Sequence, residues 1–369
     1  MGEVASSFIS GGTPNTSNNS FWNGNIPWLQ SSDLYEDILF NPLARKFISI
    51  LGLKNSSAKL IAKNSIAIIT RVGVGKLAVV PYTFTTSQDF LSFSDLKIDL
   101  NFAVYALSKL MKLEAQSTQG TSIKGVTKDV LLERSIKYPQ SKEEQTAIGN
   151  FFKQLDDTIA LHRRNYIKIQ NVKAAYLEYI FSSKFIQNKS KNTNAWEQRK
   201  LGEVATFLNG RAYKQDELLS KGKYPVLRVG NFNTNDRWYF SDLELPSKFY
   251  ADNGDLLYTW ATIFSPHIWN GKKVIYHYHI WKVEVSEKLD KFFLLQLLKA
   301  DKSLTSNTNG STMIHITKSE IENKFIKFPS IKEQQKIGLF FKQLDDTIAL
   351  HQRKYQNIGY VRRKNERLF

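Results

Sequence analysis

Two long segments of the chain carry mostly apolar side chains at spacings that alternate between four and three residues. In the first segment these positions are Ile148, Phe152, Leu155, Ile159, His162, Tyr166 and Ile169. In the second they are Ile337, Phe341, Leu344, Ile348, His351, Tyr355 and Ile358. The average period of 3.5 residues is typical of the seam of a coiled coil. Neither proline nor glycine interrupts residues 150–186, so at ~1.5 Å per residue the first helix would exceed ~50 Å.

The two segments are copies of one another. Residues 151–162 and 340–351 share one twelve-residue sequence, Phe-Phe-Lys-Gln-Leu-Asp-Asp-Thr-Ile-Ala-Leu-His. Each copy follows a proline, which pushes the residue before it out of the helical region. Each also begins with a serine followed three residues later by a glutamate, the pattern of a capping box. These pairs are Ser141 with Glu144 and Ser330 with Glu333. The chain therefore contains a duplication, and each copy is predicted to start a long helix.

A single seam of this kind could belong to an amphipathic helix packed on its own domain. Two copies with the same narrow seam instead favour pairing with each other. The second copy returns after a whole intervening domain, so an antiparallel pair is the simplest arrangement. His162 and His351 lie inside the seam. A polar residue there typically fixes register, and binding of a ligand is the alternative.

Residues 1–140 are predicted to form a mixed domain built mainly on strands. Residues 65–81 indicate a β-hairpin joined through glycines, and residues 101–115 have helical spacing. Residues 120–125 are expected to be a loop, followed by 126–131 and a short strand that ends before Pro139. A Lys-, Asn- and Ser-rich stretch, 184–194, is predicted to be a linker.

The region 191–329 echoes the first domain. Gly202-Glu-Val-Ala repeats Gly2-Glu-Val-Ala, and Tyr224-Pro-Val-Leu takes the place of Ile26-Pro-Trp-Leu. Residues 292–298 parallel the helix at 102–113, and 310–318 parallel 120–128. The globular copies diverge strongly whereas the helical copies barely change. We therefore expect an α+β protein with a pseudo-twofold internal repeat. Its parts are a domain at 1–140, a long helix and linker at 141–190, a second domain at 191–329 and a second long helix at 330–369, with the two helices forming an antiparallel coiled coil.

The charge of the chain favours a polyanionic partner. The 51 Lys and Arg residues outnumber the 34 Asp and Glu residues, giving a net charge of +17. Such an excess favours nucleic acid, because neutralised phosphates release their counterions. An anionic membrane surface would need a clustered basic helix, and a merely basic protein is the remaining alternative. The chain has no cysteine, no run long enough to span a membrane and no signal-peptide pattern, so a cytoplasmic location is expected.

Few motifs in the chain suggest catalysis. Val72-Gly-Val-Gly-Lys76 resembles a phosphate-binding loop only in part, because no helix is predicted to follow it. His277 and His279 could offer two nitrogens to a metal, but core or DNA-edge roles are favoured and no metal site is predicted. In each helix the paired acids, Asp156-Asp157 and Asp345-Asp346, point different ways and are expected to be solvated or to face a partner. No catalytic residue is predicted.

Taken together, these features resemble the specificity subunit of bacterial type I restriction–modification enzymes. They are Gly-Glu-Val-Ala at the head of each globular unit, Gly24-Asn-Ile-Pro-Trp28, Gly-Thr-Ser or Gly-Ser-Thr before each final strand, Pro-x-x-x-x-Glu-Gln at 139–145 with its shorter counterpart after Pro329, and the repeated helices. The chain departs from the family's pattern at one place, which concerns the edge of the first domain and a partner contact expected there. The second unit is preceded by residues 195–201, whereas the first starts almost directly at Gly2.

The resemblance implies a function and a set of partners. Each domain would read one half of a split site in double-stranded DNA, and the paired helices would set the gap between the halves. Two methyltransferase (modification) subunits would dock on this frame, and motor-nuclease (restriction) subunits could join them. No cofactor is expected in this chain, since S-adenosylmethionine, ATP and Mg²⁺ would belong to the partners. The alternatives are a basic coiled-coil scaffold without sequence preference and a stand-alone nuclease.

DNA contacts are expected from polar and basic residues on loops and strand edges. The candidates in the first domain are Arg71, Lys76, Gln119, Thr121, Ser122 and Lys124. Those in the second domain are Arg211, Lys214, Arg228, Lys272, Lys273, Ser311 and His315. For each of them a plain surface role is the alternative, because basic side chains are usually solvated.

Overall fold

The computed structural model describes residues 1–117, 125–190, 196–232, 235–261, 263–301 and 316–368. The chain divides into two compact units. The first comprises Met1–Leu161 and Lys354–Phe369, and the second comprises His162–Arg353. Both long helices pass through both units. Each unit therefore holds one globular domain together with a stretch of each long helix.

The globular domain of the first unit is built on a four-stranded antiparallel sheet, in the order β1 (Ala5–Ser10), β7 (Phe90–Leu96), β4 (Ser65–Ile69) and β5 (Leu77–Val80). The predicted hairpin is confirmed, since β4 pairs with β5 in a register that sets Ile66 opposite Val79. Gly73 and Gly75 lie in its turn with φ values of 95° and 106°, a region that side chains rarely adopt.

The predicted helix of the first domain is also confirmed, as α2 (Leu100–Ser117). Its apolar side chains, among them Phe102 and Leu107, share one core with Ile66, Leu91 and Phe93 of the sheet. A smaller sheet follows the order β3 (Lys46–Ile48), β2 (Ile26–Leu29) and β6 (Thr85–Thr86), with β2 and β6 parallel. Two short helices, α1 (Ile50–Lys54) and α3 (Lys128–Glu133), complete the domain.

The second globular domain repeats this plan. Its main sheet follows the order β9 (Ala205–Asn209), β16 (Ile280–Val285), β13 (Leu256–Ala261) and β14 (Ile263–Ile268), and it is covered by α6 (Lys291–Ala300). The smaller sheet follows the order β11 (Tyr239–Ser241), β10 (Tyr224–Leu227), β15 (Val274–Tyr276) and β12 (Tyr250–Ala251). The strands β10 and β15 are parallel, as β2 and β6 are in the first domain. The echo seen in the sequence is therefore a repeat of topology.

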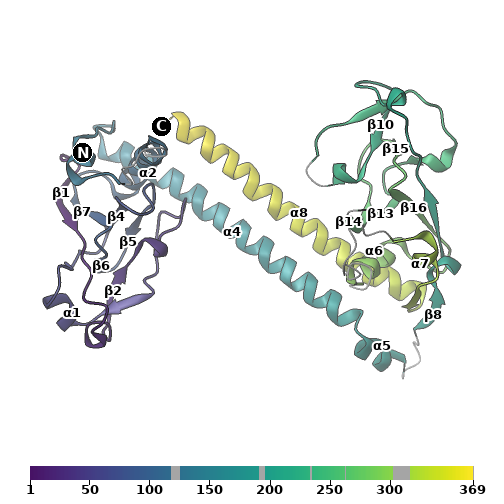
Figure 1. Cartoon of the computed structure of the whole chain (residues 1–369), viewed down its shortest axis with the longest axis horizontal. Helices are drawn as coiled ribbons and strands as arrows, with labels where there is room; N and C mark the ends of the chain where they lie inside the picture. The colour runs from purple at the N-terminus through teal and green to yellow at the C-terminus, as the bar shows by residue number, and fades with distance from the viewer. Residues whose placement is uncertain (118–124, 191–195, 233–234, 262, 302–315, 369) are drawn as a thin grey trace. The chain divides into compact units, whose positions relative to one another are not determined.

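The two long helices are α4 (Lys142–Ile180) and α8 (Ile331–Leu368), and they form an antiparallel pair (Figure 1). In the first unit Asp156 of α4 contacts Arg362 of α8. In the second unit His162 contacts His351, and Lys173 contacts Asp345. The partner number on α8 falls as the number on α4 rises, so the helices run in opposite directions. All the predicted seam positions are at least partly buried, and Phe152 and Phe341 are fully buried.

Two predictions about the connections were wrong. The expected linker is helical over α5 (Ser183–Ser190), which begins after α4 has ended at Ile180. The Ser182 hydroxyl accepts the amide of Phe185 and caps α5, so the first helical copy stops short of residue 186. Residues 191–195 lie outside the described part of the chain.

The short strand expected before Pro139 is also absent from the described part of the first domain, where residues 128–133 form α3 instead. In the second domain the equivalent strand, β17 (Phe325–Phe328), pairs with β8 (Glu197–Lys200). In the first domain the ammonium group of Met1 donates a 2.7 Å hydrogen bond to the Leu132 carbonyl. None of the helices in the described residues is long and apolar enough to cross a membrane.

Candidate nucleic-acid interface

Each domain presents one tight turn at the end of its smaller sheet, and the two turns share the same backbone hydrogen bonds. In the first domain the turn is 87–89, which follows β6. In the second it is 277–279, which follows β15. The Ser87 amide donates to the Leu29 carbonyl as the His277 amide donates to Leu227, both at 2.9 Å. We call these segments the 87–89 turn and the 277–279 turn.

The neighbouring bonds match as well. Thr70 donates its amide to Asp89, and Trp260 donates its amide to His279, at 2.8 and 3.2 Å. Gly12 donates to Thr86, and Arg211 donates to Tyr276, at 2.9 and 3.1 Å. The side chains on this common backbone frame differ completely. The first domain has Ser87, Gln88 and Asp89. The second domain has His277, Tyr278 and His279 at the equivalent positions.

The 277–279 turn is surrounded by aromatic and basic side chains. Tyr278 is 38% exposed, and its ring centroid lies 3.9 Å from that of His279 and 4.3 Å from that of His277. The Trp260 indole donates a 2.8 Å hydrogen bond to the Tyr278 carbonyl and packs edge-on against His279. Burial, aided by His279 and Arg228, lowers the pKa of His277 to about 4. His277 is therefore neutral near pH 7, and because its Nδ1 accepts the His279 amide at 3.5 Å, its Nε2–H is left to donate.

Two of the sequence candidates lie beside this turn. Arg228 follows β10 and is exposed, with its guanidinium carbon 5.4 Å from the centre of the Tyr239 ring. Arg211 forms a β-bridge with His277, but its guanidinium makes a two-point ion pair with Glu217 at 2.8 and 2.6 Å. Hydrogen bonds from Arg211 lower the pKa of Glu217 to about 2. Arg228 is thus presented outward, whereas Arg211 is engaged within the domain.

The other described candidates of the second domain are separated from the turn or only border it. Lys272 and Lys273 precede β15, at the opposite end of that strand from His277. Lys273 lies 4.7 Å over the Tyr250 ring and 3.9 Å from Asp252. Lys214 is exposed, and its amide donates to Glu217 beside Arg211. The structure therefore divides these candidates between two ends of the small sheet.

In the first domain a groove of about 350 Å³ lies beside the 87–89 turn. Its lining includes Arg71, Gln88 and Lys128. Arg71 is exposed directly after Thr70, whereas Lys76 is half-buried at the far side of the hairpin turn. The candidates Gln119, Thr121, Ser122, Lys124, Ser311 and His315 lie outside the described residues. Gln88 and Lys128 were missed by the sequence argument, since only the fold brings them next to Arg71.

Each long helix is joined to its domain by a buried glutamine that the sequence argument did not single out as a contact. Gln145 accepts the amide of Asp99 at 2.9 Å and donates to the Pro139 carbonyl at 2.8 Å. Gln334 accepts the amide of Asp290 at 2.9 Å and donates to the carbonyls of Pro329 and Lys288. Asp99 and Asp290 in turn cap the domain helices α2 and α6. The Glu-Gln motif in each copy therefore ties the start of a long helix to the start of a domain helix.

A glycine follows in each copy and lets the two helices approach. A Cβ added at Gly149 would lie 2.5 Å from the amide nitrogen of Phe102. One added at Gly338 would lie 2.9 Å from both Asp290 and the Cβ atom of Phe292. Only the fold shows why these positions require glycine.

The paired acids were expected to be solvated or to face a partner; one residue of each pair is solvated, and the other lies between helices of this chain. Asp157 and Asp346 are exposed and pair with Lys153 and Lys342 one helical turn earlier, at 2.7 Å. Asp156 and Asp345 are partly buried between helices. In the seam itself the two histidine Nδ1 atoms, on His162 and His351, lie 2.9 Å apart, so one ring donates and the other accepts.

These features define a class of protein in which two structurally repeated α+β domains are each tied to a shared antiparallel helix pair. A family model described as the type I restriction modification DNA specificity domain matches residues 1–171 and 193–360. The chain belongs to this family, as the resemblance in its sequence predicted.

Individual relatives agree with this assignment. The specificity subunit of the type I restriction enzyme MjaIX from Methanocaldococcus jannaschii is 24% identical over 399 residues, covering 98% of this chain and 89% of that protein. The MjaVIII specificity subunit of the same organism is 22% identical, covering 92% and 84%. The crystal structure of the type I restriction–modification S subunit from M. genitalium has the same fold, with a TM-score of 0.64 at 16% identity over 98% of this chain and 92% of that one.

Proposed function

We propose that this specificity subunit reads a split site in double-stranded DNA, with one half read by each globular domain. The observation that carries the proposal is the common backbone frame of the 87–89 and 277–279 turns, on which entirely different side chains are mounted. A shared backbone frame would let the turn of each domain approach a groove of the DNA in the same way. Different donors and acceptors on it would select different bases.

The side chains of the second turn suit base and backbone contacts. The exposed ring of Tyr278 offers a stacking or wedge surface, and neutral His277 offers its Nε2–H as a donor. Arg228 offers the paired donors that match guanine or a phosphate. In the first domain Arg71, Gln88 and Lys128 offer an arginine, an amide and an ammonium group around one groove. The net charge of +17 adds the sequence-independent attraction on which such reading rests.

The same proposal assigns the helix pair to spacing and assembly. Several outward positions are alike in both copies although the seam does not require it. The exposed apolar residues Leu161 and Leu350 are equivalents, as are Val172 and Val361. Two surfaces that share these residues suit two copies of one partner, and we assign that partner as the methyltransferase subunit. S-adenosylmethionine, ATP and Mg²⁺ would then belong to partner subunits, and this chain would be non-catalytic.

The test is to express the chain with the methyltransferase subunit encoded beside it and to map methylated adenines by long-read sequencing. The proposal predicts one motif made of two defined halves with an undefined gap of fixed length. Methylation without sequence preference would support a basic scaffold instead. Cutting of plasmid DNA by the purified chain with Mg²⁺ alone would support a stand-alone nuclease.

An Arg228→Ala variant assigns one half to the second domain. Loss of a good base contact costs ~1–3 kcal/mol, so methylation should relax or fall at positions of one half-site only. Lys327→Ala is the matched control, since it removes one exposed positive charge from β17 of the same domain. An equal loss across all DNA sequences would mark Arg228 as a phosphate contact.

A further inference from the structure

The first aspartate of each Asp-Asp pair joins three helices at one point. In the first unit Asp156 of α4 accepts a 2.8 Å hydrogen bond from the Tyr105 hydroxyl of α2 and forms an ion pair with Arg362 of α8. In the second unit Asp345 of α8 accepts from the Gln296 amide of α6 at 3.3 Å and from Lys173 of α4 at 2.5 Å. Each carboxylate thus ties a domain helix to both members of the long helix pair.

The two junctions are copies that exchange the roles of the long helices. Asp156 and Asp345 hold the same place in the identical twelve-residue segment. The cations that pair with them correspond too. Arg362 follows His351 in the sequence by the same number of residues as Lys173 follows His162. The donors from the domains differ in kind, a tyrosine in one and a glutamine in the other. The junction has therefore been kept in both copies while the domains diverged.

The burial of these groups makes their geometry restrictive. The side chains of Arg362 and Lys173 are 9% and 12% exposed, and those of Asp156 and Asp345 are 20% and 34% exposed. A carboxylate held away from water has few ways to satisfy its oxygens, so its donors must keep their directions. The Tyr105 ring also packs against Phe152, with the ring centroids 5.3 Å apart, so the hydroxyl that donates to Asp156 is held in place by packing.

We infer that Asp156 and Asp345 are positioning residues that set the angle at which each globular domain is held on its own stretch of the helix pair. This inference rests on the proposed function, and it deepens that function in one respect. It assigns the choice of gap length between half-sites to these two junctions as well as to the length of the helices. A domain free to tilt would still read its bases but would accept half-sites at other separations.

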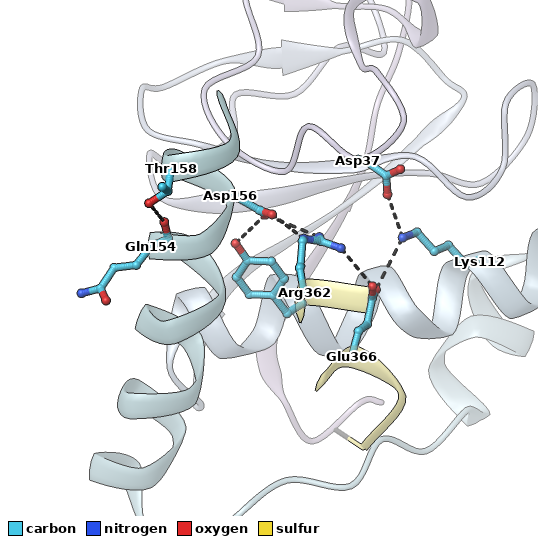
Figure 2. A network of polar contacts seen from close by, with 8 residues as sticks. Asp37, Lys112, Gln154, Asp156, Thr158, Arg362 and Glu366 are labelled. Carbon is cyan, nitrogen blue, oxygen red and sulfur yellow. Dashed lines mark hydrogen bonds and ion pairs between the residues drawn. The ribbon is translucent and has the colours of Figure 1, made fainter. Parts of the chain in front are cut away.

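The junction in the first unit is the more constrained of the two. Arg362 also pairs with Glu366 at 2.9 Å, Glu366 lies 3.5 Å from Lys112 of α2, and Lys112 pairs with Asp37 at 2.7 Å (Figure 2). The guanidinium of Arg362 also lies 5.9 Å from the centre of the Tyr105 ring. Loss of Asp156 should therefore loosen the first domain more than loss of Asp345 loosens the second.

The neighbouring aspartates provide matched controls. Asp157→Asn and Asp346→Asn make the same chemical change one residue away, at side chains that are 65% and 66% exposed and that bond only along their own helix in the described contacts. They reproduce the change in net charge without removing a hydrogen bond or an ion pair of the junction.

The experiment measures methylation by the complex of the whole chain with its methyltransferase subunits. The DNA substrates carry both half-sites at the native gap and at gaps one and two base pairs shorter or longer. For Asp156→Asn we expect the preference for the native gap to fall by about tenfold, equivalent to ~1.4 kcal/mol, with both half-site sequences unchanged. Asp345→Asn should have a smaller effect in the same direction, and the two controls should behave as the unaltered chain.

For Asp156→Asn, a uniform fall in methylation or a changed half-site would overturn the inference. A uniform fall at every gap would show that Asp156 only stabilises the fold, and a change in either half-site would show that it acts in reading. Tyr105→Phe removes one hydroxyl and keeps the packing of the ring, so it carries the test if Asp156→Asn fails to assemble. It should widen the accepted gaps to a lesser degree, and an unchanged gap preference would contradict the inference. Failure of the proposed function would be visible separately, as the absence of a split motif for the unaltered chain.

Discussion

Gly149 and Gly338 show how single residues control the attachment of the long helices. Glycine ordinarily weakens a helix by ~1 kcal/mol relative to alanine. At these two positions a Cβ would meet backbone or Cβ atoms of the domain helix at 2.5 to 2.9 Å. Close approach therefore outweighs helix propensity.

We predict that Gly149→Ala and Gly338→Ala lower the free energy of unfolding by about 1–3 kcal/mol, the typical cost of overpacking. Gly359→Ala is the control, because its Cβ would meet only the flexible end of Arg363, at 3.5 Å. It should leave stability unchanged or raise it by up to ~1 kcal/mol. Urea denaturation measures all three, and equal effects at the three glycines would contradict the account.

Gln334 is a buried polar residue whose loss leaves several groups without partners. We predict that Gln334→Ala costs about 1–3 kcal/mol, because the amide of Asp290 and the carbonyls of Lys288 and Pro329 would lose this partner and the Pro329 carbonyl is buried. Gln335→Ala, at the exposed neighbouring position, should change the urea midpoint little. A Gln334 variant as stable as the control would show that water replaces these bonds.

For single residues, the sequence showed which residue types are repeated, but it did not show which residues they contact. The duplicated Glu-Gln and Ile-Gly motifs were visible as repeats, but the residues they contact at the starts of the domain helices are 44 or more residues away and lie in segments that diverge. The two aspartates of each pair are adjacent in sequence and differ only in which helix face they occupy. Deciding which one is buried requires knowing where α2 and α6 lie.

The long helices were the most predictable elements, because the 3.5-residue seam repeats over many turns. Their bounds were less so, since α4 ends at Ile180 although no proline or glycine intervenes before residue 186. The Ser182 cap decides that end. The strand expected before Pro139 does not form, and the reason is tertiary. In the second domain β17 is a strand because it pairs with β8. In the described part of the first domain, residues 134–138 have no strand to pair with.

The histidine pair gives a prediction at the scale of the helix pair. A polar pair in a seam favours one register at some cost in stability. The double variant His162→Leu, His351→Leu should therefore raise the stability of the helix pair by ~1 kcal/mol, since half-buried apolar area replaces polar atoms. Thermal unfolding of the double variant and of both single variants measures this. A double variant less stable than the parent would mean that the histidine pair is itself a net stabilising contact.

For the whole molecule, duplication predicted the order of domains and helices and the family. Only some of the predicted DNA-contact residues lie beside the two turns that we propose read DNA. Arg71 and Arg228 lie beside equivalent turns, but Lys272 and Lys273 belong to the other end of the small sheet. Tyr278 and Gln88 were missed because their importance comes from a backbone frame that no local pattern encodes. An aromatic-rich stretch such as 276–281 was the available signal.

In the proposed function, two independent readers are held at a separation set by the paired helices. Because α4 and α8 pair antiparallel, one heptad must be inserted into each, at facing positions near residues 165 and 349, to keep the seam in register. Seven residues add ~10 Å of helix, or about three base pairs of DNA. Long-read mapping of methylated adenines should then show both half-sites unchanged and the gap longer by about three base pairs. An altered half-site, or methylation that stays at the original gap, would contradict the account.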